Sequence, residues 1–180
     1  EVLGVSGLMG AGRTEIMETI FGSIKKDSGI VYIEGKEINI KNPFTAIENG
    51  IAFVTEDRKT EGLMHENSIE ENIAIANLDL ISNNSVLSKN KIEDLSIRAV
   101  DKFRIRSTGI KHICQNLSGG NQQKVFLAKW VMETPKILIL DEPTRGVDIG
   151  AKQDIYNIIN TLAEEGVGII MVSSELPEIL

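Results

Sequence analysis

The stretch Leu117-Ser118-Gly119-Gly120-Asn121-Gln122-Gln123 decides the fold of this chain. A serine and two glycines stand immediately before an amphipathic pattern over Gln122 to Met132, which predicts a helix with an exposed N-terminus. Unpaired backbone N–H groups and the helix dipole make such an end a natural anion site. Ser118 has a simpler alternative role, as the residue that caps this helix.

A second glycine-rich stretch, Gly7-Leu8-Met9-Gly10-Ala11-Gly12-Arg13-Thr14, follows the apolar run Val2 to Val5. It fits the phosphate-binding pattern G-x-x-x-x-G-K-S/T with arginine in place of lysine. Glycines let successive backbone N–H groups turn toward phosphate oxygens, and Thr14 would offer its hydroxyl to Mg²⁺. Without the lysine, an ordinary glycine-rich turn between a strand and a helix remains an alternative.

A third stretch, Ile137-Leu138-Ile139-Leu140-Asp141-Glu142-Pro143-Thr144, places two carboxylates at the end of an apolar strand. Ligands of doubly wound sheets bind at the carboxyl ends of the strands, so this strand and the strand before Gly7 would deliver their loops to one site. We expect Asp141 to hold Mg²⁺ through water and Glu142 to polarise the attacking water as general base. The alternative is an acidic turn before Pro143.

Strand and helix patterns alternate along most of the chain, which predicts an α/β fold with a parallel sheet. The expected strands are Val2–Ser6, a hairpin over residues 30–40, Ile51–Val54, Ile137–Leu140 and Gly168–Val172. Val2 to Val5 is apolar without alternation, as expected for a core strand covered on both faces. Between Glu66 and Glu133 the strand patterns vanish and helical patterns appear, with Ser82 to Asn90 as the expected mobile loop.

We therefore predict one domain over residues 1–180, with a core lobe of residues 1–60 and 134–180 and a helical subdomain of about 61–133. Both ends look like cuts, because the first residues resemble a core strand and the last, Pro177 to Leu180, resemble the start of a helix. The net charge of −7 argues against a nucleic-acid partner. The single cysteine, Cys114, is expected to be a small buried group in a reducing compartment, and neither a membrane span nor a signal peptide is recognised.

The stretch at Leu117 is identified as the signature motif of ABC ATPases, and it precedes the Asp141-Glu142 strand by one helix and a short loop, as in that family. GLMGAGRTE from Gly7, TEDRKTEGL from Thr55, LSGGNQQKV, DEPTRGVD from Asp141 and SSELPEIL from Ser173 together resemble the C-terminal domain of tandem ATPases for ribose, galactose and xylose import. The resemblance implies the P-loop NTPase fold of the ABC ATPase type, with a mostly parallel sheet, a small antiparallel part and an inserted helical subdomain.

The resemblance also implies roles for individual residues. ATP would be bound by Gly7, Met9, Gly10, Ala11, Gly12, Arg13, Thr14 and Glu15. Leu117, Ser118, Gly119, Gly120 and Gln122 would complete an ATP site on a partner domain. Glu56, Asp148 and Ser174 would be switch positions, and Thr14, Asp141 and Glu56 would contact Mg²⁺.

Three positions depart from the general ABC pattern. A planar guanidinium at Arg13 cannot occupy the place of a compact ammonium. Glu56 stands where the family usually has glutamine, and Ser174 stands where most members have a histidine that contacts the γ-phosphate. We therefore expect this domain to be a degenerate half that binds ATP but hydrolyses it little. Its intact signature would complete the ATP site of the partner domain.

The implied cofactors are ATP and Mg²⁺. The implied partners are a second ABC domain, N-terminal in the same chain, a membrane permease and, indirectly, a sugar-binding protein. The implied location is the cytoplasmic face of the cell membrane, as a peripheral component. A non-catalytic regulatory half and an importer of nucleosides or a related furanoside remain alternatives. A soluble ABC ATPase of DNA repair or translation would need coiled-coil arms or a basic face, which are not visible.

Overall fold

The computed structural model describes residues 1–8, 10–84 and 86–179. The chain divides into two compact units: unit 1 is Glu1–Phe53, Pro135–Pro143 and Leu162–Leu180, and unit 2 is Val54–Thr134 and Thr144–Thr161. Thr144–Thr161 therefore belongs to the same compact unit as the helices between Val54 and Thr134. The predicted lobe boundaries near residues 60 and 134 stay a prediction.

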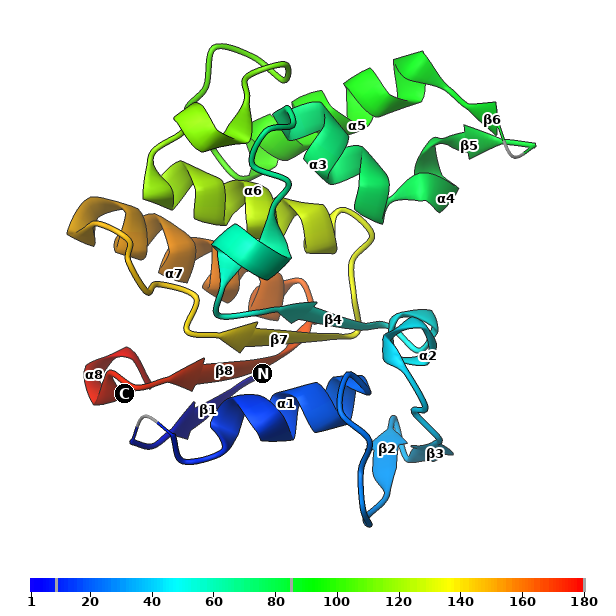
Figure 1. Cartoon of the computed structure of the whole chain (residues 1–180), viewed down its shortest axis with the longest axis vertical. Coiled ribbons are helices and arrows are strands. Elements are labelled where there is room, and N and C mark those ends of the chain that lie inside the picture. The colour runs from blue at the N-terminus through cyan, green and yellow to red at the C-terminus, as the bar shows by residue number, and fades with distance from the viewer. Residues whose placement is uncertain (9, 85, 180) are drawn as a thin grey trace. The chain divides into compact units, whose positions relative to one another are not determined.

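Unit 1 is built on a four-stranded sheet in the order β1-β8-β7-β4 (Figure 1). Both β1 and β7 run parallel to β8, and an antiparallel hairpin, β2–β3, is attached. The strands are β1 (Val2–Ser6), β2 (Val31–Ile33), β3 (Lys36–Ile38), β4 (Ile51–Val54), β7 (Ile137–Asp141) and β8 (Gly168–Ser173). The helices of this part are α1 (Arg13–Phe21), α2 (Pro43–Glu48) and α8 (Leu176–Ile179). The expected strands are therefore present.

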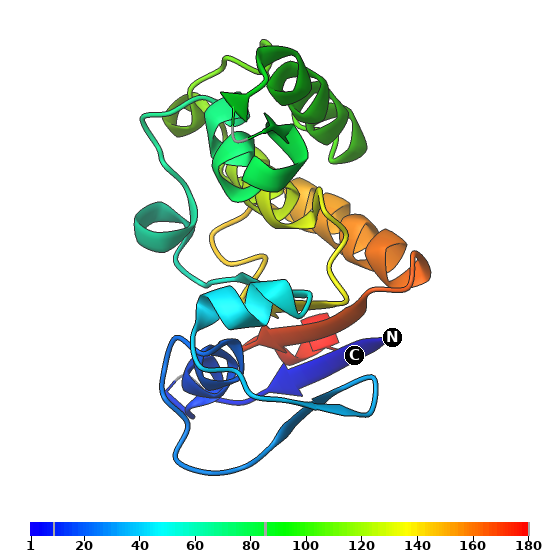
Figure 2. The same ribbon diagram turned by 90° about the vertical axis from the view of Figure 1, so that its right-hand side faces the viewer.

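The core of unit 1 lies on β4 and β7, where nearly every residue is buried. Their unbroken aliphatic runs match this position, because a strand with two covered faces has no polar side. The prediction that β1 is covered on both faces is wrong. Strand β1 is at the edge of the sheet beside β8 (Figure 2), and Val2 and Leu3 are 44% and 57% exposed. Helix α8 packs on this strand, since a Cβ on Gly4 would lie 2.3 Å from Ile179.

Unit 2 is mainly helical. Its elements are η1, a π-helical turn (Arg58–Gly62), α3 (Ile69–Ala76), α4 (Leu78–Ile81), β5 (Ser82–Asn83), β6 (Val86–Leu87), α5 (Lys89–Lys102), η2, a 3₁₀ turn (Cys114–Asn116), and α6 (Gly119–Val131). Helix α7 (Ile149–Glu164) begins in unit 2 and ends in unit 1. Among the described residues no helix has the length and apolarity needed to cross a membrane.

The expectation that strands vanish between Glu66 and Glu133 is wrong at one place. The segment predicted as a mobile loop contains a short antiparallel hairpin, β5–β6. It then enters α5, whose first turn is capped by the Ser88 side chain. Strands of two residues are too short to produce an alternating pattern, so the polar composition of this segment favoured a loop.

A buried asparagine organises the segment that leads to the signature stretch. Asn72, on α3, is fully buried, and its side-chain nitrogen donates hydrogen bonds to the carbonyls of Met64 and Ser68. The same nitrogen lies 3.3 Å from the sulfur of Cys114. Burial raises the pKa of the Cys114 thiol to about 11, so the predicted role of this cysteine as a small buried group is confirmed.

The predicted α/β fold class, with a parallel sheet core and small antiparallel parts, is confirmed.

Candidate functional site

The glycine-rich stretch Gly7–Thr14, which is the predicted phosphate-binding loop (phosphate loop), leads from β1 into α1. Gly10 and Gly12 both have φ of 79°, a backbone conformation that glycine adopts without strain. Gly12 is the N-cap of α1, and no side chain caps this end. The first N–H groups of a nine-residue helix therefore point out of its terminus, as an anion site requires. Met9 lies outside the described residues.

The other predicted residues of the loop surround this helix end. Gly7 packs against the side chain of Arg13, and the Ala11 N–H donates to the Leu8 carbonyl. Glu15 lies in the first turn of α1 with its side chain exposed.

Thr14 and Asp141, predicted as the Mg²⁺ pair, are brought together across 127 positions of sequence. The Thr14 hydroxyl donates to Oδ2 of Asp141 over 2.6 Å. Oδ1 of Asp141 is buried without a hydrogen-bond partner, and burial raises the pKa of this carboxyl. A hydroxyl beside an unpartnered carboxylate oxygen fits a hard divalent cation, which prefers oxygen ligands and whose charge would favour the ionised carboxylate.

No group of three His, Cys, Asp or Glu side chains in the described ranges is arranged to hold a metal ion by itself. A magnesium site of the P-loop kind would need only one or two protein oxygens, together with phosphate oxygens and water.

Arg13 and Glu142 form a partly buried ion pair. Nη2 of Arg13 lies 3.4 Å from Oε1 of Glu142, and the two side chains are 11% and 9% exposed. Nη1 of Arg13 is buried without a hydrogen-bond partner. The residue at the lysine position therefore holds the side chain of the predicted general base.

The backbone of Glu142 is held in an uncommon conformation. Its φ is 47°, in the left-handed region that costs a non-glycine residue about 1 kcal/mol or more. The Glu142 N–H donates to the Val172 carbonyl over 2.9 Å, and Oε1 accepts from the Ser174 N–H over 2.7 Å. The predicted switch residue Ser174 thus contacts Glu142 through its backbone, while its side chain is exposed. Such strain often accompanies a functional site.

The signature stretch occupies the start of α6. Ser118 is the N-cap residue, but its hydroxyl makes no capping bond to the helix backbone and accepts from the side chain of Asn121 over 2.9 Å. Ser118 therefore occupies the expected N-cap position of this helix without forming the side-chain hydrogen bond of a cap. Its side chain is exposed, whereas Leu117 is buried.

Two signature residues are fixed by close packing. A Cβ on Gly120 would lie 2.3 Å from Cβ of Ala151, so α6 approaches the start of α7 more closely than a larger residue permits. The Gln122 side chain is buried and donates to the carbonyls of Cys114 and Leu117. In this structure Gln122 thus positions the backbone that precedes Ser118.

The remaining switch positions lie in unit 2. Glu56 forms an ion pair with Arg145, while the Asp148 side chain accepts from the Ala151 N–H at the start of α7 over 3.0 Å. Thr14 and Asp141, in contrast, belong to unit 1. Its predicted contact with Mg²⁺ stays a prediction.

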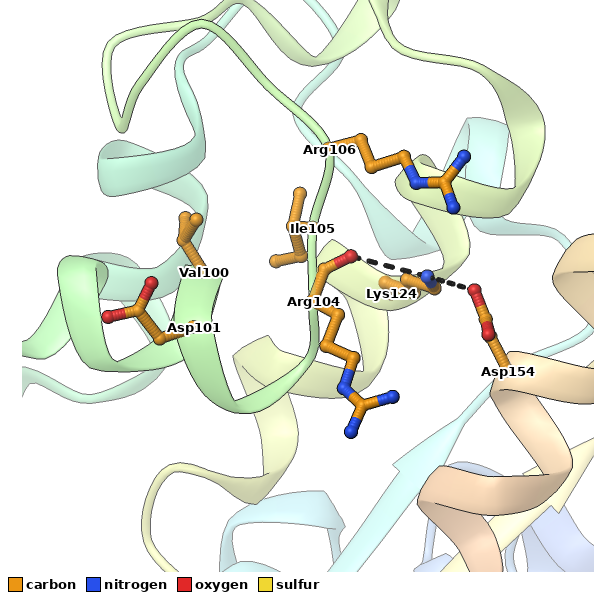
Figure 3. Close-up of a pocket in the computed structure, with 7 residues that line it drawn as sticks. All are labelled: Val100, Asp101, Arg104, Ile105, Arg106, Lys124 and Asp154. Carbon is orange, nitrogen blue, oxygen red and sulfur yellow. Dashed lines mark hydrogen bonds and ion pairs between the residues drawn. The ribbon is translucent and has the colours of Figure 1, made fainter.

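A charged pocket in unit 2 includes the middle of α6 (Figure 3). Lys124, whose side chain is 3% exposed, contacts Asp154 of α7 at 2.6 Å and donates to the Arg104 carbonyl. The pocket is lined by Val100, Asp101, Arg104, Ile105, Arg106, Lys124 and Asp154. The Lys124–Asp154 pair ties the signature helix to α7, and no motif in the sequence indicates it.

A family model described as ABC transporter matches residues 1–145. The chain is 56% identical over 180 residues to the ribose import ATP-binding protein RbsA of Halalkalibacterium halodurans. It is 51% identical over 181 residues to the xylose import ATP-binding protein XylG of Thermoanaerobacter pseudethanolicus. Both alignments cover all of this chain and 36% of the relative, so the chain spans about a third of the length of these proteins.

Two solved structures share the fold. A nucleotide-free ATP-binding cassette from an ABC transporter has a TM-score of 0.79 at 25% identity, over 99% of this chain and 71% of that one. A dimeric post-hydrolysis state of an ATP-binding cassette bound to ADP and Pi has a TM-score of 0.80 at 20% identity, over 99% and 77%. Because the family match includes both the phosphate loop and the strand-end carboxylates, this chain belongs to the ABC transporter family.

Proposed function

We propose that this chain is an ATP-binding and hydrolysing domain that powers monosaccharide import through an ABC transporter. The proposal is supported by the identity of 51–56% to proteins named for ribose and xylose import. Because those proteins are almost three times longer, a second ABC domain in the same polypeptide is the proposed partner. A membrane permease, and indirectly a sugar-binding protein, complete the assembly, with this domain at the cytoplasmic face of the membrane.

The chain's own residues would divide the work as follows. The N–H groups of the Gly7–Thr14 loop and of α1 would bind phosphate oxygens. Thr14 and Asp141 would hold Mg²⁺, and Glu142 would orient the attacking water. When bound, ATP supplies the phosphoanhydride bond whose cleavage releases energy, and Mg²⁺ offsets the charge that develops on its phosphates.

We further propose that this half is degenerate in its own ATP site. The observation that carries this step is the contact of Arg13 with Glu142 at 3.4 Å. A guanidinium paired with that carboxylate would offer less charge to the phosphates, and the pairing would occupy one oxygen of the general base. Ser174, with its exposed and uncharged side chain, cannot replace a histidine at the γ-phosphate.

We propose in addition that the signature stretch serves the partner domain. The Ser118 hydroxyl is exposed and makes no bond to its own helix backbone, so it is available as a donor. The N–H groups at the start of α6 add a positive dipole at the same place. Both features are those expected of a surface that binds the γ-phosphate held by another domain.

The test is ATP binding and phosphate release by the purified chain, compared with its Glu142→Gln variant. We expect a monomer that binds ATP with Mg²⁺ and releases phosphate barely above background in both forms. Robust turnover that Glu142→Gln abolishes would overturn the degenerate site. Failure of ATP to bind at all would overturn the function itself. Turnover that is absent in the full-length tandem protein as well would contradict ATP hydrolysis as its function.

A further inference from the structure

Arg58 connects two segments that belong to different sequence motifs, the stretch after β4 and the loop after Thr144. It lies in η1, just after β4, and its Nη1 donates to the Arg145 carbonyl over 2.9 Å. Its Nη2 donates to the Gly146 carbonyl over 3.3 Å. A planar guanidinium with fixed donors suits two neighbouring carbonyls, whereas a lysine ammonium offers one compact charge. The loop after Thr144 is therefore fastened to the segment after β4.

The backbone of the signature stretch contacts the same guanidinium at Gly119. A Cβ on Gly119 would lie 3.1 Å from Nη2 of Arg58 and 3.2 Å from the Gly146 carbonyl oxygen. The backbone at Gly119 therefore lies directly against both groups. Gly119 is needed here because it leaves room for this contact, in addition to any role toward a phosphate.

The turn that carries Arg58 is itself fixed to α6. A Cβ on Gly62 would lie 2.6 Å from the ring of Phe126, so the end of η1 packs tightly on the signature helix. Lys129 donates to the Gly62 carbonyl over 2.9 Å. At the other end, the Asp57 side chain accepts from the N–H groups of Lys59 and Thr60 and caps the turn. Arg58 thus projects from a turn that is held at both ends.

We propose that Arg58 is a positioning residue that joins the segment after β4, the Arg145–Gly146 loop and the signature glycine Gly119 into one rigid piece. The Glu56–Arg145 ion pair reinforces the same junction. The proposal rests on the proposed function only in assigning the signature to ATP, since the junction itself is a property of unit 2. As a consequence, a movement of the segment after β4 changes the position of the Ser118 hydroxyl and of the N–H groups at the start of α6.

The test is amide hydrogen exchange in the purified chain with Arg58→Met and Arg58→Lys. Lys59→Met is the matched control, because Lys59 is exposed in the same turn. The probes are the amides of Val147 and Gln122, which donate to the carbonyls of Thr144 and Ser118. Losing two charge-assisted bonds should speed exchange at both probes about tenfold. We expect a smaller change in Arg58→Lys and none in Lys59→Met.

A second variant, which changes the other side of the contact, keeps the proposal testable if Arg58→Met folds poorly. Gly119→Ala would place a methyl group 3.1 Å from Arg58 Nη2 and 3.2 Å from the Gly146 carbonyl oxygen, so one of them must shift although the guanidinium is intact. This variant should produce the same local pattern at Val147 and Gln122. The amide of Ile16, in unit 1, should exchange at its normal rate in every variant. Unchanged exchange at both probes, or a uniform increase over all of unit 2, would overturn the proposal.

Turnover in the full-length tandem protein gives a separate readout. If the signature is displaced but ATP still binds to the phosphate loop of the other domain, Arg58→Met should lower kcat several-fold with little change in KM, and Arg58→Lys should recover part of it. A rise in KM with unchanged kcat would contradict this positioning role. Absence of ATP turnover in the unaltered protein would contradict the proposed function, while the exchange result would still stand.

Discussion

Nη2 of Arg13 lies 3.4 Å from Oε1 of Glu142, although 129 positions of sequence separate the two residues. Arg13 stands at the lysine position of the phosphate loop, and Glu142 is the proposed general base. The contact therefore joins the altered residue and the proposed catalytic residue in one ion pair. Any nucleotide that draws the guanidinium toward its phosphates must first separate this pair.

The first prediction concerns Arg13→Lys. A lysine ammonium is compact and suits the phosphates, and the variant loses the long guanidinium contact with Glu142. A partly buried ion pair with a single contact of 3.4 Å contributes on the order of 1 kcal/mol, so we expect ATP to bind about fivefold more tightly. Phosphate release should stay low, because Ser174 is unchanged. Calorimetric titration with Mg·ATP measures the affinity, and equal or weaker binding would contradict the prediction.

The second prediction concerns Asp154→Asn, which leaves the buried Lys124 ammonium with only the Arg104 carbonyl. Asp154 is 38% exposed, so water replaces part of its effect. We expect a loss of about 1–2 kcal/mol of unfolding free energy, measured by urea denaturation. Lys124→Met and the double variant complete a cycle, and additive losses would show that the pair is not coupled.

The same pair gives a pH dependence. The hydrogen bond from Lys124 holds the pKa of Asp154 below its ordinary value of 3.8. A carboxyl with a lowered folded-state pKa contributes stability above its unfolded pKa and loses it as the pH falls through the folded value. The wild type should therefore exceed Asp154→Asn most at neutral pH, with the difference shrinking below about pH 4. A difference that grows in acid would have the wrong sign.

The third prediction concerns the contact of Gly120 with Ala151. A Cβ added at Gly120 would lie 2.3 Å from the Ala151 methyl group, so Gly120→Ala should lower the free energy of unfolding by about 1–3 kcal/mol. Ala151→Gly removes the opposing methyl group at a helix cost of about 1 kcal/mol. The double variant should therefore be more stable than the sum of the two single losses predicts. Strict additivity in urea denaturation would exclude the steric explanation.

The sequence predicted the elements whose pattern is local and missed the contacts that depend on distant segments. The apolar runs of β4 and β7 and the amphipathic α6 were recognised because their periodicity is visible within a few residues. Strand β1 has the same apolar character, but its position at the edge depends on strand order, which periodicity does not encode. The hairpin β5–β6 was missed because its strands have only two residues each.

The same distinction between local patterns and contacts of distant segments applies to the candidate site. Thr14 and Asp141 were expected near each other because both follow parallel strands of one sheet. The engagement of Glu142 by Arg13, and the joining of three segments by Arg58, depend on side-chain directions that no local pattern specifies. Lys124 resembles any polar residue on a helix, and only its packing against Asp154 and the Arg104 carbonyl distinguishes it.

The last prediction compares Ser118→Arg with Arg13→Ala in the full-length tandem protein. Ser118 and the N–H groups after it would face the γ-phosphate held by the phosphate loop of the other domain, where charge develops during transfer. Losing one such donor typically costs about a hundredfold or more in rate. The bulky cation at position 118 should in addition obstruct closure of the two domains. We therefore expect Ser118→Arg to abolish most sugar uptake and phosphate release.

Arg13→Ala should weaken ATP binding at its own site and leave most of the transport intact, because we propose that this site turns over little ATP in the unaltered protein. Both variants are measured side by side in vesicles that contain the permease, with sugar uptake and phosphate release as the two readouts. Lys59→Met serves as a control for expression and assembly, since its side chain is exposed and outside both sites. Equal losses in the two variants would mean that both sites turn over ATP. A larger loss in Arg13→Ala would mean that the Arg13 site is the productive one, which would overturn the asymmetry on which the proposed function depends.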